Sequence, residues 1–413
     1  MGTGQADNPQ DVSRRRVFYI PGYDPIHPRR YRELYRKEGA AQARISGYRI
    51  GLSPKRTGGL YGWHVDSEMD GQAVTADVEV LVWSDIVRDS MSTSIPATYA
   101  QLVRTAWEYI ATGALRRLMR LRKGPVIAAL YPIGMLLLQL TCAMVLGWAA
   151  FAVIGWLAGG LGAVATLAGL VAWGGIVWAV LRWFKKKDGK FFAYYLMHDY
   201  AYSARYRGAN PPELEARMAA FGEIIAEALT DDVQEVLVVG HSSGAHLAVS
   251  ILADLIRAGR VPANGPKLAF LSLGQVVPMV SFLRGAHRLR ADLRYLSARE
   301  ELTWVDVTAP GDGCAFALCD PVSVSGVAPE GKRWPLVFSA QFTRSLSPER
   351  WKELRWKFFR LHFQYLCAFD RPLDYDYFQI TAGPVSLSAR YCDRPPSNSR
   401  IDVPVSKYTS IAA

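Results

Sequence analysis

The chain has 413 residues and a formal net charge of +11, and half of its residues are apolar. This length allows one large domain or two ordinary ones, and the apolar share excludes a disordered chain, a collagen-like fibre and a small disulfide scaffold. The five cysteines are scattered without Cys-x-x-Cys or zinc spacing, so we expect reduced thiols in a reducing compartment. The basic excess alone is compatible with binding to nucleic acid or to an anionic membrane surface. Where the basic residues lie along the chain must distinguish these two kinds of partner.

The N-terminal part contains Arg14-Arg15-Arg16, which resembles a twin-arginine export signal. No long apolar stretch follows the arginines, so we predict no cleavable signal. Short strands are predicted over 16–20, before Pro-Gly-Tyr-Asp, and over 78–83. The first dozen and the last twenty residues are expected to be loosely ordered.

A segment of 58 residues, from Gly124 to Leu181, contains no Asp, Glu, Lys, Arg or His. One spanning helix needs about 20 apolar residues, so this segment is long enough for two. Gly159-Gly160-Leu161-Gly162 lies near its centre and suits a tight turn. We therefore predict a transmembrane hairpin, with helices over 127–156 and 161–183, that contacts the lipid bilayer through residues 125–183.

Basic residues gather on both sides of this hairpin. The flanks 116–123 and 182–190 hold ten Lys and Arg residues and one acid, which is +9 in seventeen residues and leaves +2 for the rest of the chain. Both flanks and both termini are therefore predicted to lie on the cytoplasmic side of a cytoplasmic membrane, and nucleic acid is not expected as a partner. Small residues that recur in the second helix are expected to let the two helices pack closely: Gly162, Ala165, Gly169 and Ala172.

Helices and strands alternate after the hairpin. An amphipathic helix is predicted over 211–229, an apolar strand over 235–239 and a small-residue helix over 245–257, followed by strands over 267–273 and 302–307. This alternation predicts an α/β fold, a mainly parallel sheet flanked by helices, with the transmembrane hairpin inserted into it.

The strand 235–239 runs directly into Gly240-His241-Ser242-Ser243-Gly244, a G-x-S-x-G nucleophile elbow. Gly240 and Gly244 leave room for neighbouring backbone, and the following helix directs its N-terminus at developing negative charge. Here the chain resembles the α/β-hydrolase superfamily. The loop Pro-Gly-Tyr-Asp-Pro at 21–25 and the run His-Phe-Gln-Tyr at 362–365 make it similar to a group of bacterial membrane-bound, esterase-like hydrolases.

The resemblance implies that nucleophile, acid and base follow one another along the chain, with Ser242 as the nucleophile. Three histidines follow Ser242. His246 lies on the elbow helix and is expected to face away from the site, and His287 precedes the candidate acids. His362 is left as the base.

The acid is expected in the loop after the strand 302–307. Asp312 lies in that loop, Asp320 is the alternative, and Asp306, inside the strand, is the third choice. The acid would hold His362 in the required tautomer. Each residue also has an ordinary alternative, an Asp-Gly turn at 312 and a core histidine at 362.

Two backbone N–H groups are expected to bind the oxyanion. One belongs to Ser243, the residue after the nucleophile. The other comes from the loop after the first strand, either from Tyr23 or from Gly22.

The sequence thus predicts a membrane-anchored serine hydrolase that cleaves an ester or thioester through an acyl-enzyme on Ser242. The position beside a membrane suggests a lipid or another amphiphile as the substrate. An acyltransferase with the same residues and a non-catalytic interaction module remain open. The expected division is 1–115 for the N-terminal part of the hydrolase domain, 116–190 for the hairpin with its flanks, and 191–413 for the main catalytic part. Without a metal site, phosphate loop or dinucleotide fingerprint, no cofactor is predicted, and the oligomeric state is left open.

Overall fold

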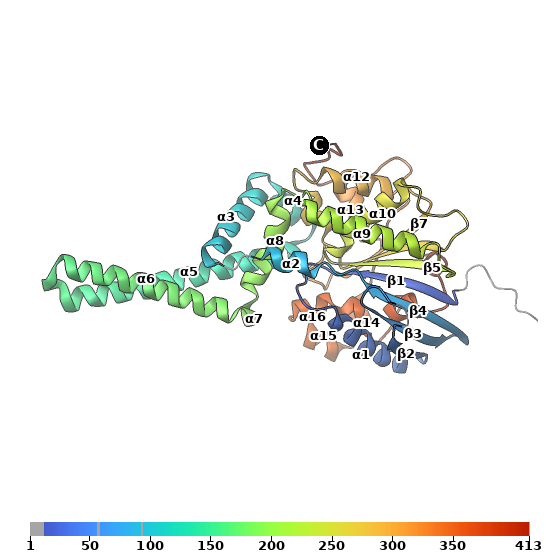
Figure 1. Cartoon of the computed structure of the whole chain (residues 1–413), viewed down its shortest axis with the longest axis horizontal. Coiled ribbons are helices and arrows are strands. Elements are labelled where there is room, and N and C mark those ends of the chain that lie inside the picture. Colours follow the sequence, from blue (N-terminus) through green and yellow to red (C-terminus); the bar gives the residue numbers. More distant parts are fainter. Residues whose placement is uncertain (1–11, 56–57, 92–93, 413) are drawn as a thin grey trace, which may run out of the picture.

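The computed structural model describes residues 12–55, 58–91 and 94–412 (Figure 1). Its centre is one eight-stranded sheet in the order β2-β3-β4-β1-β5-β6-β7-β8. β2 and β3 pair in antiparallel fashion, as do β3 and β4, and all other neighbours are parallel. The strands are β1 (Arg14–Ile20), β2 (Arg49–Pro54), β3 (Gly62–Met69), β4 (Gln72–Val80), β5 (Glu235–His241), β6 (Lys267–Leu273), β7 (Leu302–Thr308) and β8 (Leu336–Ser339).

Helices cover both faces of the sheet (Figure 1). One face carries α9 (Pro212–Ala228), α10 (Gly244–Arg257), α11 (Val277–Ser281), α12 (His287–Leu296) and α13 (Pro321–Val324). The other carries α1 (Arg29–Ser46), α14 (Phe342–Ser345), α15 (Pro348–Leu354), α16 (Phe358–His362), η2 (Gln364–Leu366), α17 (Tyr377–Ala382) and α18 (Leu387–Arg390). The predicted α/β class with a mainly parallel, helix-flanked sheet is confirmed.

The central strands match their predictions because their side chains are apolar on both faces. All seven residues of β5 are buried, as expected for a parallel strand between two helical layers. The strand predicted over 78–83 is displaced, since β4 ends at Val80. β2, at the edge of the sheet, and β3 beside it were not predicted, because polar and exposed residues interrupt their apolar runs, and β8 has only four residues.

The beginning of β1 is fixed by a buried ion pair. The Arg15 guanidinium donates to the Glu235 carboxylate over 2.6 Å and to the carbonyl oxygens of Gly383 and Val385. Glu235 also accepts a hydrogen bond from the Leu387 N–H group. Removal of either charge would leave its partner buried and unpaired, which is strongly destabilising.

The expectation of a loosely ordered C-terminal segment is wrong. Ile401 exchanges backbone hydrogen bonds with the segment 318–320, and the N–H groups of Val405 and Ser406 donate to the Val324 carbonyl. The segment folds because its backbone groups find partners on the α13 side of the sheet. At the other end of the chain, residues 1–11 lie outside the described residues.

A long insertion connects β4 to α9. It comprises α2 (Ser84–Ser90), α3 (Ile95–Ala111), α4 (Ala114–Leu121), α5 (Lys123–Ala158), η1 (Gly159–Leu161), α6 (Ala163–Lys186), α7 (Asp188–Phe191) and α8 (Ala193–Arg205). Figure 1 shows α5 and α6 projecting together, away from the sheet and its helices. Both helices are long and apolar enough to cross a membrane. The turn at η1 lies where the glycines predicted it.

The two helices of the hairpin touch through small residues. A Cβ atom on Gly169 would lie 2.7 Å from the Phe151 ring, and one on Gly147 would lie 2.8 Å from the Trp173 ring. Ala165 and Gly169 are buried, as their spacing predicted, whereas Gly162 lies exposed in the turn. Such contacts allow the backbones to approach closely without a polar interface.

The hairpin is anchored in the rest of the protein by the start of α5. With 36 residues, α5 is about 54 Å long, well beyond the roughly 30 Å of a hydrocarbon core. Its first turns pack inside the body: Val126 and Leu136 are buried, and the Tyr99 hydroxyl on α3 donates to the Leu136 carbonyl over 2.8 Å. The predicted first helix, 127–156, was therefore too short.

Candidate active site

The candidate site lies at the carboxyl edge of the sheet, where the order of the strands reverses. After β1 the chain forms β2, β3 and β4 on one side of that strand. After β5 it forms β6 and β7 on the opposite side. In open α/β sheets ligands bind at such a switch point, because the loops diverge there. The loops after β1, β5, β6 and β7 all emerge at this edge, and β4 sends the insertion out from it as well.

Ser242 forms a sharp turn between β5 and α10. Its φ is +57°, in the left-handed region that non-glycine residues avoid, and its N–H donates to the Leu273 carbonyl over 2.9 Å. The strain is held in place by the strand before the turn and the helix after it. The side chain is half-buried and faces the main cavity.

Close backbone packing explains the two glycines of the motif. A Cβ atom on Gly244 would lie 2.1 Å from the Ile20 carbonyl oxygen, and one on Gly240 would lie 2.7 Å from the Ala245 Cα. Gly22 approaches from the other side, since its Cβ would lie 3.0 Å from the Cβ of Ser242. No side chain fits at Gly240 or Gly244 without backbone movement, and one at Gly22 would press against Ser242.

His362 and Asp312 form a buried hydrogen-bonded pair. His362 Nδ1 lies 2.7 Å from Asp312 Oδ2. The second carboxylate oxygen accepts the Cys314 N–H, and the Tyr365 hydroxyl donates to Oδ2 over 3.0 Å. Burial by itself would raise the pKa of Asp312, but the neighbouring His362 and these hydrogen bonds outweigh it and hold the pKa below its usual value.

The other two candidate acids have different partners. Asp320 caps α13 by accepting from the N–H groups of Val322 and Ser323, and it pairs with Lys332 at 2.6 Å. Asp306 accepts from the Ser272 hydroxyl inside the sheet, and burial raises its pKa to about 8. Of the three, only Asp312 contacts His362.

The remaining histidines after Ser242 take no part in this pair. His246 lines a small separate cavity together with Tyr23, and burial lowers its pKa to about 4. His287 lies 3.3 Å from an Arg290 nitrogen at the start of α12.

Two residues that the sequence did not single out position His362. The His241 ring stacks on the His362 ring at 4.9 Å, and its Nε2–H donates to the His362 carbonyl, while its Nδ1 faces the Tyr19 hydroxyl. Burial and the neighbouring His362 lower the pKa of His241 to about 3, so it stays neutral. Tyr365, three residues after His362, donates a hydrogen bond from its hydroxyl to Asp312. Its place in His-Phe-Gln-Tyr was the available signal.

The loop after β1 and the turn after β5 present free backbone donors beside Ser242. The N–H groups of Gly22, Tyr23 and Ser243 make no hydrogen bond to any other described residue. The loop itself is fixed from the insertion: the Trp83 indole donates to the Pro21 carbonyl, and the Tyr195 hydroxyl donates to the Tyr23 carbonyl. These donors suit the binding of negative charge.

Asp24 holds the same loop from the opposite side. Its carboxylate accepts from the Ile26 N–H, the Arg30 guanidinium and the Tyr31 hydroxyl. Asp24 is buried, and all three partners belong to the loop or to the start of α1. It therefore acts as a structural residue of the loop.

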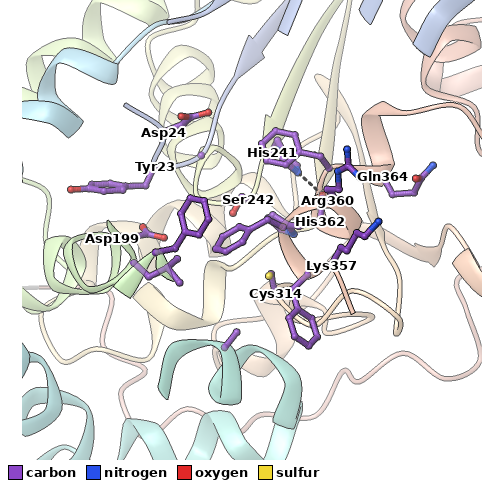
Figure 2. Close-up of a pocket in the computed structure, with 18 of the residues that line it drawn as sticks. Tyr23, Asp24, Asp199, His241, Ser242, Cys314, Lys357, Arg360, His362 and Gln364 are labelled. Carbon is purple, nitrogen blue, oxygen red and sulfur yellow. Dashed lines mark hydrogen bonds between the residues drawn. The ribbon is translucent and has the colours of Figure 1, made fainter. Parts of the chain in front are cut away.

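A cavity of about 1940 Å³ opens over these groups. In Figure 2, Ser242 lies between Tyr23 and Asp199 on one side and His362, Lys357 and Cys314 on the other. The walls come from the loops of the sheet edge, from α8, from the first turns of α5 and from the segment around α16. The space is larger than the ~300–1,000 Å³ of common ligand pockets.

Asp199 on α8 also lines this cavity and was not predicted. Its carboxylate makes no hydrogen bond or ion pair with another described residue. Burial raises its pKa to about 7, although the nearby His362 acts in the opposite direction. Its position follows from the tertiary fold, because α8 lies far from Ser242 in the sequence.

One cluster has the composition of a metal site. The donor atoms of Asp312, Cys314 and His362 lie within 4.8 Å of one another. Two of these residues already hydrogen-bond to each other, and burial beside Asp312 raises the pKa of the Cys314 thiol well above its usual value. A thiol that keeps its proton is a poor metal ligand, so the cluster fits a proton-transfer pair better than a metal centre.

No protein-family model, curated protein or solved structure matches this chain. The function must therefore be argued from the site itself.

We predict that Gly244→Ala destabilises the protein by about 3 kcal/mol or more, because the new methyl group would overlap the Ile20 carbonyl. The measurement is thermal unfolding of the full chain in detergent. Gly222→Ala on α9, where a Cβ meets nothing within 4 Å, is the matched control and should stabilise by about 0.5–1 kcal/mol. Equal stability of the two variants would contradict the described elbow.

Asp199 should make stability depend on pH. Its pKa is higher in the folded protein, about 7, than in the unfolded chain, so its contribution is lost as the pH rises from about 4 to 7 and stays lost above. Asp199→Asn removes this loss, and we expect its unfolding midpoint to exceed that of the wild type by more at pH 8 than at pH 5. A constant difference between pH 5 and pH 8 would show that the carboxyl is not shifted.

Proposed function

We propose that the protein is a serine hydrolase that cleaves an ester or thioester through an acyl-enzyme on Ser242. The observation that carries this proposal is the hydrogen bond between His362 and Asp312, together with the fact that His362 lines the same cavity as Ser242, whose φ is +57°. A nucleophile, a base and an acid that orients the base are the parts needed for acyl transfer by serine. The proposal includes an α/β-hydrolase type of domain.

In the proposed reaction Ser242 Oγ attacks the substrate carbonyl while His362 Nε2 takes the hydroxyl proton. Asp312 occupies Nδ1 of the same ring, which leaves Nε2 as the nitrogen for proton transfer. The N–H groups of Ser243 and of Tyr23 or Gly22 would bind the oxyanion. His362 then gives the proton to the leaving alcohol or thiol, and water attacks the acyl-enzyme with His362 again as base.

Transfer of the acyl group to an acceptor other than water would use the same residues. The size of the cavity, about 1940 Å³, leaves room for a second substrate beside the acyl group. The acyltransferase alternative therefore stays with the proposal, and product analysis with and without added alcohols would distinguish the two.

A fluorophosphonate probe tests the nucleophile and the acid together. Wild-type protein in membranes should be labelled, Ser242→Ala should not, and Asp312→Asn should be labelled at least about 100-fold more slowly, because His362 loses its orienting charge. Asp320→Asn is the matched control. It loses only the Lys332 pair and should keep its labelling rate.

Two results would count against this assignment. Absence of labelling in the wild type, under conditions that label another serine esterase, would favour a non-catalytic interaction module. A larger loss at position 320 than at position 312 would move the acid to Asp320.

We further propose that α5 and α6 span a cytoplasmic membrane, with the catalytic domain and both termini on the cytoplasmic side. The support is the charge pattern: both ends of the hairpin are basic, and the turn at η1 carries no charge. A reporter that is active only in the cytoplasm should work when fused to the C-terminus, and a reporter that is active only outside should be silent. The opposite pattern would reverse the orientation.

A further inference from the structure

The cavity extends from Ser242 to the foot of the hairpin. Its wall includes residues from the first turns of α5, among them Pro125, Ile127 and Tyr131, and Phe192 from the connection after α7. α5 continues from these turns into the helix proposed to cross the bilayer. The cavity is thus bounded by the part of the chain at which the proposed span begins.

A six-residue segment, Arg355-Trp356-Lys357-Phe358-Phe359-Arg360, is here called the rim segment, and its last five residues form another part of the cavity wall. All six residues are exposed. Trp356 is 72% exposed, Phe358 49% and Phe359 40%. Alternating aromatic and basic side chains are typical of segments that lie in a membrane interface, where rings enter the acyl boundary and cations face anionic headgroups.

The rim segment lies beside the end of the hairpin. The ring centroids of Phe359 and Phe192 are 5.5 Å apart. Phe192 is the residue after α7, the short helix that follows α6. On the inner side, a Cβ on Gly313, next to Asp312, would lie 3.1 Å from the Phe358 ring. The segment therefore connects the hairpin foot with the loop that carries the acid.

A second apolar surface lies on α3, which packs against α8 and touches α6. Val103, Trp107 and Ile110 follow one another at helical spacing, and Trp107 is 71% exposed. Figure 1 shows α3 beside the base of the projecting hairpin. Soluble proteins rarely leave several large apolar side chains uncovered in one place.

We infer that the substrate is a bilayer-resident amphiphile, a long-chain ester or thioester, whose tail reaches the cavity between the rim segment and the first turns of α5. The inference rests on the proposed serine hydrolase. The bilayer is the occupant of the apolar surfaces, because the rim segment and α3 both lie beside the foot of the hairpin, whose two helices are long and apolar enough to cross a membrane. The tail would lie along Ile127, Tyr131 and Phe192, with its carbonyl at Ser242.

Chain length gives the first test. If the cavity binds the tail, each added methylene that becomes buried should raise kcat/KM about fourfold for water-soluble p-nitrophenyl esters from acetate to octanoate. A flat or falling series would overturn the inference while leaving the proposed hydrolase intact.

The rim segment gives the second test, with the full chain in vesicles of phosphatidylcholine and phosphatidylglycerol. The measured quantity is the rate on bilayer-dissolved 4-methylumbelliferyl oleate divided by the rate on p-nitrophenyl acetate. The double substitution Trp356→Ser with Phe359→Ser should lower this ratio at least fivefold. Val403→Ser, which alters a side chain that is 59% exposed and lies outside the cavity wall, should leave it unchanged. A double variant with the ratio of the control would refute the role of the rim.

Fluorescence quenching by brominated phospholipids separates docking from catalysis. The quenched signal of the wild type should exceed that of Trp356→Phe, because Trp356 would lie in the bilayer interface. No difference would refute docking even if the esters are hydrolysed. Quenching without turnover of either ester would support the docking surface and count against the proposed hydrolase.

Discussion

The close approach of Gly244 to the Ile20 carbonyl oxygen is the contact on which the rest of the site depends. It brings the first turn of α10 against the end of β1, so the loop after β1 and the turn after β5 meet at the switch point of the sheet. No side chain fits between them at Gly244, and Ser242 makes the turn with a positive φ. Gly22 then faces Ser242 directly. The close packing of β1 against α10 thus places both the serine and the free N–H donors at the same point of the sheet edge.

The His362–Asp312 pair depends on a different balance, in which burial disfavours the charged carboxylate and neighbouring groups offset this effect. A carboxylate as buried as Asp312 would gain a proton unless hydrogen bonds and neighbouring groups favoured the charged form. His362, Tyr365 and the Cys314 N–H supply those interactions, and the pKa is lowered. Asp306 and Asp199 show the contrast, because each lacks such a set and has a raised pKa. The local hydrogen bonds therefore separate the three acids more than their burial does.

The sequence predicts those parts of the molecule that local patterns determine. The buried strands β5, β6 and β7 have continuous apolar runs, and the turn from β5 into α10 carries its glycines at fixed positions. The uncharged segment with basic flanks predicts the hairpin. The outer strands β2 and β3 escape prediction because only part of their side chains is buried. The C-terminal segment does so because its hydrogen-bond partners lie far away in the sequence.

The same distinction applies to the candidate site. Ser242, His362 and Asp312 were predicted from the motif and from the order that the resemblance implies. The structure places a hydrogen bond of 2.7 Å between His362 and Asp312, and the catalytic roles of the three residues stay a prediction. Asp199 and His241 could not be assigned in this way. Asp199 enters the cavity because α8 packs against α3 and α5, and His241 matters because its ring lies under that of His362. Tertiary packing, not spacing in the chain, places both.

The insertion has more than an anchoring role in this arrangement. Trp83 and Tyr195 hold the loop after β1, Asp199 lines the cavity, and the first turn of α5 meets the acid loop, where a Cβ on Gly124 would lie 3.3 Å from Gly313. The short helix α16 joins the two regions on the other side: it begins at Phe358, in the rim segment, and ends at His362. If α5 and α6 cross a bilayer as proposed, a displacement at the hairpin foot or at the rim would reach both Asp312 and His362 within a few residues. The site and its proposed membrane contact therefore share one set of elements, so the geometry of the pair depends on how the insertion is seated.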